Sequence, residues 1–298
     1  MEKENKFFLL FIVIIVCALL GALVWVKMRA NDIHPVTSMS KEESGGKLLR
    51  EPVEVPAMTD TKIISSDPFK RYTLEVHYPT VSLAQHPELA KDANTVIRAF
   101  ASDTIESFTK DVEEMYSPNI PKEFTSDLSV RWTVLLESPT LLSLRFDESE
   151  YIAGSAHPNT QTRILNYDME RHLLLQTGDL FASSTKALPF LSTYTREKLK
   201  TILLDQPKDI YDTQGLKGTE PTTENFSVVG IEKSGLLVVF TPYQVAPYAR
   251  GTIQISVPTQ DLLDELSPRV RAAMSAASTN IVEATPENTS STSKNGLK

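Results

Sequence analysis

Hydrophobic and polar positions divide the chain into one apolar run, a patterned middle and two polar stretches. The apolar run, Phe7–Val26, has twenty residues and no charge. A helix of that length rises about 30 Å, close to the thickness of a bilayer's hydrocarbon core. The run is longer than the apolar part of a cleaved signal peptide, about 7–15 residues, and it ends in Trp25-Val26-Lys27, a poor cleavage context. We therefore expect one uncleaved transmembrane signal anchor that contacts the lipid bilayer through Phe7–Val26.

The orientation of this anchor follows from size more than from flanking charge. Lys3 and Lys6 precede the run, and Lys27 and Arg29 follow it, so the positive charges are nearly balanced. A long segment that follows a first apolar run is usually exported. We expect a single-pass protein of the cell membrane, with a cytoplasmic N-terminus and an extracytoplasmic C-terminal domain.

In residues 61–170, apolar residues recur with the period of a strand in some segments and with the period of a helix in another. In Arg71–Tyr78, apolar and charged residues alternate, which is typical of a strand with one buried face. From Pro87, apolar residues at steps of three and four predict one long helix that ends at Ser117-Pro118. Three more strands are predicted, at Leu128–Glu137, around Leu142–Phe146 and at Thr160–Asp168.

Residues 171–267 use the same ingredients in another order. The predicted elements are a helix around Pro189–Leu204, a hairpin of Phe226–Glu232 and Leu236–Thr241, a strand at Thr252–Val257 and a short helix at Thr259–Leu266.

The expected fold class is α+β. Ser/Pro turns and short connections favour an antiparallel meander over βαβ units. We predict an antiparallel sheet with one long and one shorter helix packed on it, preceded by a single transmembrane helix. The predicted parts are a short cytoplasmic end with the anchor (1–30), a flexible linker (31–60), an N-terminal α+β part (61–170), a C-terminal α+β part (171–267) and a disordered tail (268–298).

Charge limits the class of partner. Residues 1–30 hold four of the 30 basic and two of the 38 acidic side chains, which leaves 26 against 36, a net charge of −10. Such a surface repels nucleic acid and anionic lipid and favours cationic partners. The only cysteine, Cys17, lies in the apolar run, so disulfides and Cys-ligated zinc are excluded after it, and we expect no cofactor.

One polar cluster offers candidate chemistry. Asp147, Glu148, Glu150 and His157 fall within eleven residues, and these residue types are the ones that bind divalent cations or transfer protons. Their spacing matches no metal-site template, and the nearby Gly-Ser-Ala-His is not a G-x-S-x-G elbow. We assign no catalytic or metal residue. The alternative is a cell-wall glycan hydrolase or transferase with Asp147, Glu150 and His157 as its acid/base set, which requires these side chains to converge.

An aromatic group precedes the last predicted strand. Tyr243, Tyr248 and Arg250 bracket Pro247, and Tyr and Arg are enriched at protein interfaces. The simpler interpretation is a loop packed on the edge of the sheet.

Two groups of short motifs carry a family resemblance. They are Gly154-Ser155-Ala156-His157-Pro158-Asn159-Thr160, Asn166-Tyr167-Asp168 and Thr177-Gly178-Asp179-Leu180-Phe181, followed by Phe240–Gly251 (FTPYQVAPYARG). In order and spacing the chain resembles, over about residues 62–265, a family of bacterial extracytoplasmic domains. That family includes the lysozyme-binding ectodomain of the anti-sigma factor RsiV and the non-catalytic N-terminal region of PdaC-type peptidoglycan deacetylases.

The resemblance implies an α+β domain outside the membrane that recognises a protein, such as a lysozyme-like protein, or a cell-wall component. Six residues before the anchor are too few to hold a sigma factor, and a polar tail stands where the deacetylases carry a catalytic domain. We therefore expect a binding or sensing module that is not an enzyme. The residues expected to contact the protein or peptidoglycan-related ligand are His157, Asn159, Tyr243, Tyr248 and Arg250.

Overall fold

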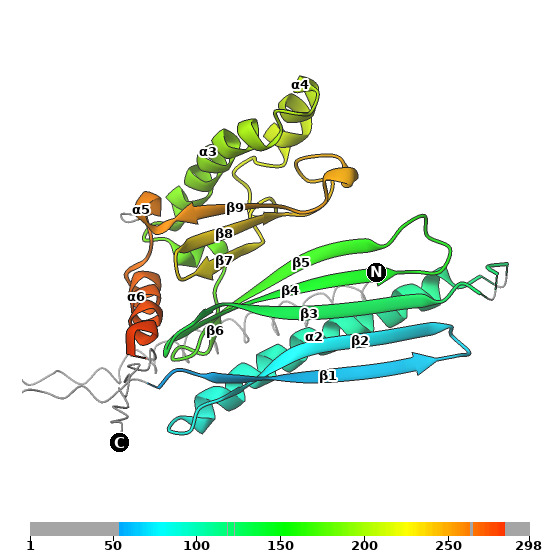
Figure 1. Cartoon of the computed structure of the whole chain (residues 1–298), viewed down its shortest axis with the longest axis horizontal. Helices are drawn as coiled ribbons and strands as arrows, with labels where there is room; N and C mark the ends of the chain where they lie inside the picture. The colour runs from blue at the N-terminus through cyan, green and yellow to red at the C-terminus, as the bar shows by residue number, and fades with distance from the viewer. Residues whose placement is uncertain (1–53, 118, 122, 263–264, 284–298) are drawn as a thin grey trace, which may run out of the picture. The chain divides into compact units, whose positions relative to one another are not determined.

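The computed structural model describes residues 54–283, except positions 118, 122 and 263–264 (Figure 1). The predicted transmembrane run, most of the predicted linker and residues 284–298 of the predicted tail lie outside these residues. In the described part, no helix is long and apolar enough to cross a membrane.

Six strands form one mixed sheet in the order of the sequence, and α2 covers one of its faces (Figure 1). The elements are β1 (Ala57–Asp67), β2 (Tyr72–Ser82), α2 (Pro87–Met115), β3 (Ser126–Glu137), β4 (Leu141–Tyr151), β5 (Asn159–Asp168) and β6 (Leu173–Leu174). The predicted long helix and the four predicted strands of this part are confirmed.

The prediction of a purely antiparallel sheet is wrong at one pair, because β2 and β3 are parallel. The 29 residues of α2 rise about 43 Å, whereas an 11-residue strand spans about 36 Å. The helix thus carries the chain back along the whole sheet, and β3 begins beside the start of β2. The other neighbours in this sheet pair antiparallel.

A second sheet has three antiparallel strands, as the predicted hairpin and following strand require. Its elements and the helices around it are η1 (Thr177–Leu180), α3 (Ser184–Ile202), α4 (Lys208–Ile210), η2 (Tyr211–Gly215), β7 (Val229–Glu232), β8 (Gly235–Phe240), η3 (Tyr248–Arg250), β9 (Ile253–Pro258), α5 (Thr259–Leu262) and α6 (Pro268–Glu283).

Two apolar cores support these layers. In the first, Ala93, Ile97 and Phe108 of α2 pack with Val76 and Phe146 of the six-stranded sheet, and each is at most 1% exposed. The spacing of the three helical residues is the apolar stripe that predicts the helix. Burying one such large side chain contributes about 1.5–3 kcal/mol.

The second core lies between the three-stranded sheet, α3 and α6. Leu191 and Leu199 of α3 pack with Val238 and Val257, and Leu141 of β4 joins them from the six-stranded sheet. The two faces of the larger sheet thus contribute to different cores, the second through Leu136 and Leu141.

Strand β7 forms the junction between the two sheets. Asn166 of β5 donates its amide to the Val229 carbonyl at 2.7 Å, and Ser143 of β4 accepts from the backbone N–H of Ile231 at 3.1 Å. The Ser143 hydroxyl in turn donates to the Asn166 side chain at 2.7 Å. A Cβ added at Gly230 would lie 2.3 Å from a methyl group of Leu135, so any larger residue there would have to displace the Leu135 side chain.

Two predicted boundaries are wrong. The linker does not extend to residue 60, because β1 begins at Ala57; as an edge strand it is mostly exposed and lacks a clear apolar alternation. Residues 268–283 are not disordered, because they form α6. Its small residues look like a polar tail, but Val270, Ala273, Met274 and Ala277 recur at helical steps and are buried.

The end of α6 nearest the sheet is fixed by a buried ion pair. Asp168, which is fully buried, accepts from Nε and Nη2 of Arg269, and Glu170 accepts from the same guanidinium at 2.9 Å.

We expect Asp168→Asn to lower the free energy of unfolding by about 2–3 kcal/mol, because Arg269 would lose its charged acceptor. The exposed Glu170→Gln is the matched control and should cost less than about 1 kcal/mol. Urea unfolding followed by circular dichroism measures both, and equal effects would contradict this role for Asp168.

Candidate binding sites at the distal end of the sheet

We call the end of the larger sheet where β1 and β4 finish the distal end; β2, β3 and β5 begin there. Along β4, side chains alternate between the two faces. Leu142, Leu144 and Phe146 point toward α2, and the same period places Glu148 and Glu150 on that face near the distal end. The polar residues thus continue the buried stripe where the apolar core stops.

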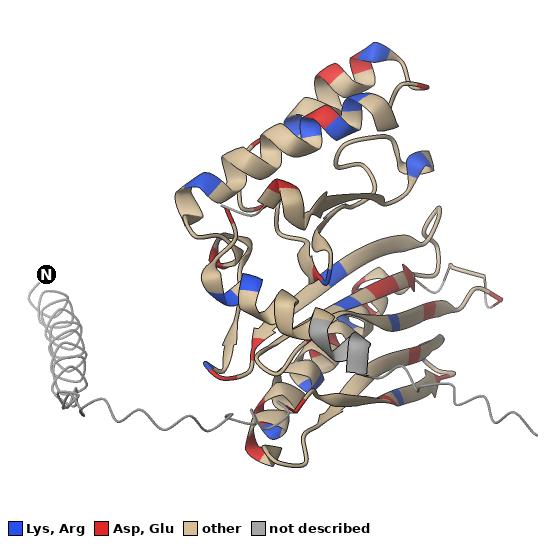
Figure 2. Ribbon diagram, turned by 60° about the vertical axis from the view of Figure 1, so that its left-hand side comes forward, with Lys and Arg blue, Asp and Glu red and all other residues tan. Residues whose placement is uncertain are grey.

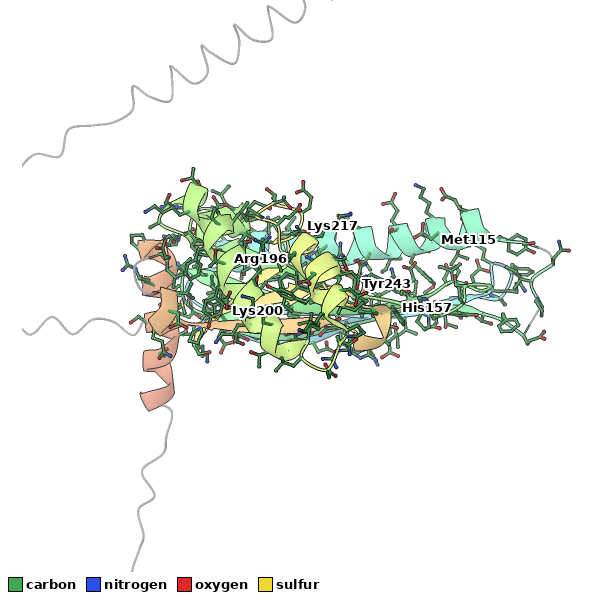
Figure 3. All side chains as sticks on the ribbon, turned by 90° about the horizontal axis from the view of Figure 1, so that it is seen from above. Met115, His157, Arg196, Lys200, Lys217 and Tyr243 are labelled. Carbon is green, nitrogen blue, oxygen red and sulfur yellow. The ribbon has the colours of Figure 1, made fainter. Side chains whose placement is uncertain are left out.

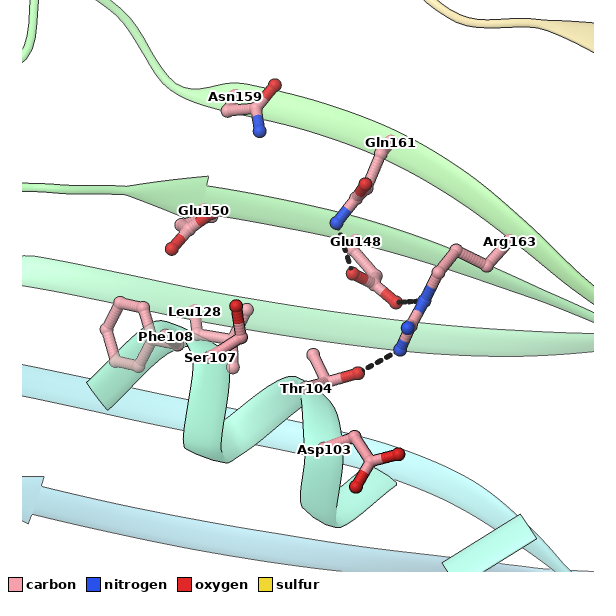
Figure 4. Close-up of a pocket in the computed structure, with 10 residues that line it drawn as sticks. All are labelled: Asp103, Thr104, Ser107, Phe108, Leu128, Glu148, Glu150, Asn159, Gln161 and Arg163. Atoms are coloured by element: carbon pink, nitrogen blue, oxygen red, sulfur yellow. Dashed lines mark hydrogen bonds and ion pairs between the residues drawn. The ribbon is translucent and has the colours of Figure 1, made fainter. Parts of the chain in front are cut away.

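These carboxylates line a small pocket between α2 and strands β3, β4 and β5 (Figure 4). Its volume is about 70 Å³. The residues around it are Asp103, Thr104, Ser107, Phe108, Leu128, Glu148, Glu150, Asn159, Gln161 and Arg163. We call this space the carboxylate pocket.

Within the pocket, Glu148 is fully partnered. It is 5% exposed and accepts from Arg163 Nε at 2.6 Å and from the Gln161 amide at 2.8 Å. The Arg163 guanidinium also donates to the Thr104 hydroxyl and lies 3.7 Å from the centre of the Phe100 ring. The Arg163 guanidinium is therefore paired with groups of the protein itself, through hydrogen bonds and a cation–π contact.

Glu150 differs from Glu148. Its Oε1 is buried, and among the described residues it has no hydrogen-bond partner. Burial raises the pKa of Glu150, and the negative charges of Asp111 and Glu148 raise it further. The pocket thus holds one carboxylate whose charge no described side chain compensates.

On the other face of the sheet, three aromatic side chains form what we call the aromatic cluster: His157, Tyr243 and Tyr248. The rings of His157 and Tyr248 stack with their centres 4.2 Å apart, and those of Tyr243 and Tyr248 are 5.3 Å apart. The Tyr248 hydroxyl donates to the Pro158 carbonyl at 2.9 Å, and His157 Nδ1 lies 2.9 Å from the same oxygen. The cluster joins the β4–β5 loop to the loop before β9.

Tyr243 and His157 are the exposed members of the cluster, and Tyr243 is labelled with His157 in Figure 3. Tyr243 is 57% exposed, and its backbone has φ +70°, in the left-handed region. A bulky residue in that region costs about 1–3 kcal/mol, and such strain is concentrated at functional sites.

The other two predicted contact residues lie apart from this cluster. Arg250 donates to Asp205 at 2.9 Å and to the Ile202 carbonyl at 2.7 Å, at the C-terminal end of α3. That arrangement neutralises orphan helix carbonyls and gives Arg250 a structural role. Asn159 lines the carboxylate pocket, two residues beyond His157.

The predicted acid/base set is wrong, because the sheet separates its members. Asp147 faces away from α2 and is bound by Arg145 at 2.8 Å and by the Thr162 hydroxyl at 2.7 Å. Glu150 lies in the pocket on the opposite face, and His157 stacks on Tyr248. Across the residues that the structure describes, no three His, Cys, Asp or Glu side chains are placed to hold a metal ion.

Among the pocket residues on α2 and β5, Asp103, Gln161 and Arg163 are not predicted from the sequence. A usable signal is the period of two along β4: once Leu142 and Phe146 face inward, Glu148 and Glu150 must do so too. Gln161 and Arg163 lie 13 and 15 residues after Glu148, on the next strand, and Asp103 comes from α2, so no local pattern relates them to Glu148.

Comparison with known proteins gives two family matches along the chain. Residues 68–160 match the family described as "Deacetylase PdaC", and residues 178–260 match "Protein of unknown function (DUF3298)". The peptidoglycan-N-acetylmuramic acid deacetylase PdaC of Bacillus subtilis (strain 168) is 27% identical over 203 residues, which cover 66% of this chain and 39% of that protein. The chain thus spans about two fifths of the length of this relative, and the predicted resemblance is confirmed.

Two solved structures of DUF3298 family proteins match this chain in the comparison with known structures. One, from Bacteroides fragilis NCTC 9343, is 17% identical with a TM-score of 0.50, and the match covers 76% of this chain and 99% of that one. The other, from Pseudomonas aeruginosa PAO1, is 14% identical with a TM-score of 0.49 and coverages of 74% and 97%.

The unpaired carboxylate makes a prediction about stability and pH. Because the pKa of Glu150 is raised in the folded state, that state binds more protons than the unfolded chain at pH values just above the ordinary pKa of 4.5, so stability falls as pH rises through this interval. We expect Glu150→Gln, which cannot ionise, to unfold at higher urea concentration than the wild type at pH 7. The difference should shrink toward pH 3.5.

The exposed Glu106→Gln on α2 is the control, with an expected change within about 0.5 kcal/mol at either pH. A Glu150→Gln variant less stable than the wild type at pH 7 would contradict the assignment.

Proposed function

Since this chain carries a region of the PdaC family followed by a region of the DUF3298 family, we propose that it is a membrane-anchored, extracytoplasmic binding module. The proposal includes the single-pass topology expected from Phe7–Val26 and the absence of enzymatic activity. In this proposal the module recognises a protein or a peptidoglycan-related component of the cell wall.

The aromatic cluster is the observation that carries the proposal. It exposes Tyr243 beside two further rings, at a place where both family regions contribute side chains. Tyrosine supplies a large contact area at low entropic cost, and Tyr is enriched at interface hot spots. The strained backbone of Tyr243 supports a role in binding over one in packing, because an exposed ring adds little to a core.

Charge favours a cationic protein as the partner. Residues 61–170 contain 17 acidic and 10 basic side chains, and α2 alone contains seven and three. Residues 171–267 are nearly balanced, with 11 acidic and nine basic (Figure 2). An excess of negative charge on one part of the surface steers positively charged partners and selects against anionic ones. A lysozyme-like protein has this chemistry, and it is the partner that the family resemblance implies.

We expect Tyr243→Gly to separate binding from stability. Glycine adopts φ +70° without strain, so the free energy of unfolding should change by less than about 1 kcal/mol, while loss of the ring should weaken binding at least about tenfold. Calorimetry with hen lysozyme at low and moderate salt measures the affinity. The matched control is Leu173→Ala, which removes a 53%-exposed side chain from the opposite end of the sheet and should leave binding unchanged.

If the wild type does not bind lysozyme at either salt concentration, a lysozyme-like protein is excluded as the partner. Soluble peptidoglycan fragments, titrated in the same way, test the cell-wall component. If neither binds, the proposed recognition role fails.

The proposed topology makes a separate prediction. Protease added to intact cells should remove the folded part, residues 54–283, because it would lie outside the membrane. The measurement is immunoblotting of whole cells and lysates after digestion. A chain that resists protease on intact cells but is digested in lysates has the reverse orientation.

A further inference from the structure

We propose that the carboxylate pocket accepts a protonated primary amine, the side-chain ammonium group of a lysine on a protein partner. This inference rests on the proposed function only for the source of the lysine. The recognition of an alkyl ammonium group is a property of the pocket itself.

The shape of the pocket fits the end of a lysine side chain. The volume of about 70 Å³ leaves space for an ammonium group with its last methylenes and is too small for a sugar or an aromatic ring. Phe108 and Leu128 supply an apolar wall for the methylenes. Glu150 and Ser107 carry oxygen acceptors at the same space, with Asn159 beside them (Figure 4), and an ammonium group has three N–H donors.

The charges around the pocket select a cation. Arg163, the only cation among the described lining residues, is already held by Glu148, Thr104 and the Phe100 ring. Glu150 and Asp103 remain, with Asp111 close enough to raise the pKa of Glu150. An anion would be repelled, and a neutral group would leave Glu150 Oε1 desolvated without a charge to offset it.

Among cations, a lysine fits better than arginine or a metal ion. A guanidinium prefers both oxygens of one carboxylate, whereas one of the two oxygens of Glu150 is buried. A metal ion needs several close ligands, which the described His, Cys, Asp and Glu side chains do not supply. A compact ammonium on a flexible stem can reach a narrow pocket from outside.

The position of the pocket favours a lysine carried by a protein. Its rim includes Asp103 and Ser107 on the exposed side of α2, the element with seven acidic and three basic residues. A positively charged protein surface would be attracted to this helix, and a single lysine could then enter the pocket.

The test uses the full-length protein in detergent and two small probes. One probe is Nα-acetyl-lysine-N-methylamide, and the other is the same molecule with its side-chain amine acetylated. We expect the first to bind, with its affinity measured by NMR titration, and the second to bind at least tenfold more weakly. Glu150→Gln should weaken binding of the amine at least tenfold, whereas the matched charge change Glu106→Gln should stay within twofold.

Loss of binding in Glu150→Gln cannot be mistaken for unfolding, because this variant is expected to be more stable than the wild type. Equal affinity for the two probes, unchanged affinity in Glu150→Gln, or no binding of the amine by the wild type would each overturn the proposal.

The Tyr243→Gly variant distinguishes this proposal from the proposed function. It should bind the amine probe as the wild type does, because the aromatic cluster lies on the other face of the sheet. If the wild type binds the amine but neither lysozyme nor peptidoglycan fragments, the recognition role fails and the pocket assignment stands. If lysozyme binds but the amine does not, the pocket assignment fails alone.

Discussion

The close approach of β7 to the larger sheet is the constraint on which the aromatic cluster depends. Gly230 permits that approach, and the hydrogen bonds among Ser143, Asn166 and the backbone of β7 satisfy the polar groups that it buries. Buried polar groups are costly unless all are paired, so such a junction admits one arrangement and penalises others. Because of it, the loop before β9 reaches the β4–β5 loop, and Tyr248 can stack on His157.

The larger sheet then gives its two faces different chemistry. Its α2 face is apolar until Phe146, and the next two residues on that face of β4 are Glu148 and Glu150. An isolated carboxylate there would be strongly disfavoured. Glu148 is tolerated because Arg163 and Gln161 bind it, whereas Glu150 keeps a buried oxygen without a described partner. The unpaired oxygen of Glu150 lowers the stability of the fold. Such a residue is expected in a binding site, whereas a core with only a structural role would carry an apolar residue there.

Much of the fold follows from local pattern, since the long helix and the strands between residues 71 and 257 have clear periods of 3.6 and 2. The predictions are wrong for three features without a local signal in the sequence. These are the exposed edge strand β1, the parallel β2–β3 pair set by the length of α2, and α6, whose small residues resemble a tail. At the sites, the sequence identified His157, Tyr243 and Tyr248, which the fold brings together. It could not separate Asp147 from Glu150 without the strand period, nor pair Glu148 with Arg163, which depends on tertiary contact.

The members of the aromatic cluster have different roles, and their hydrogen bonds distinguish the supporting residues from the residue that would contact a partner. The Tyr248 hydroxyl and His157 Nδ1 both lie 2.9 Å from the Pro158 carbonyl oxygen, so these two atoms bind within the protein. Pro158 immediately precedes Asn159 at the rim of the carboxylate pocket. Tyr248 and His157 therefore hold the segment that separates the two sites, and they act as supports. Tyr243 is 57% exposed and has a strained backbone, so it is the ring best suited to contact a partner directly.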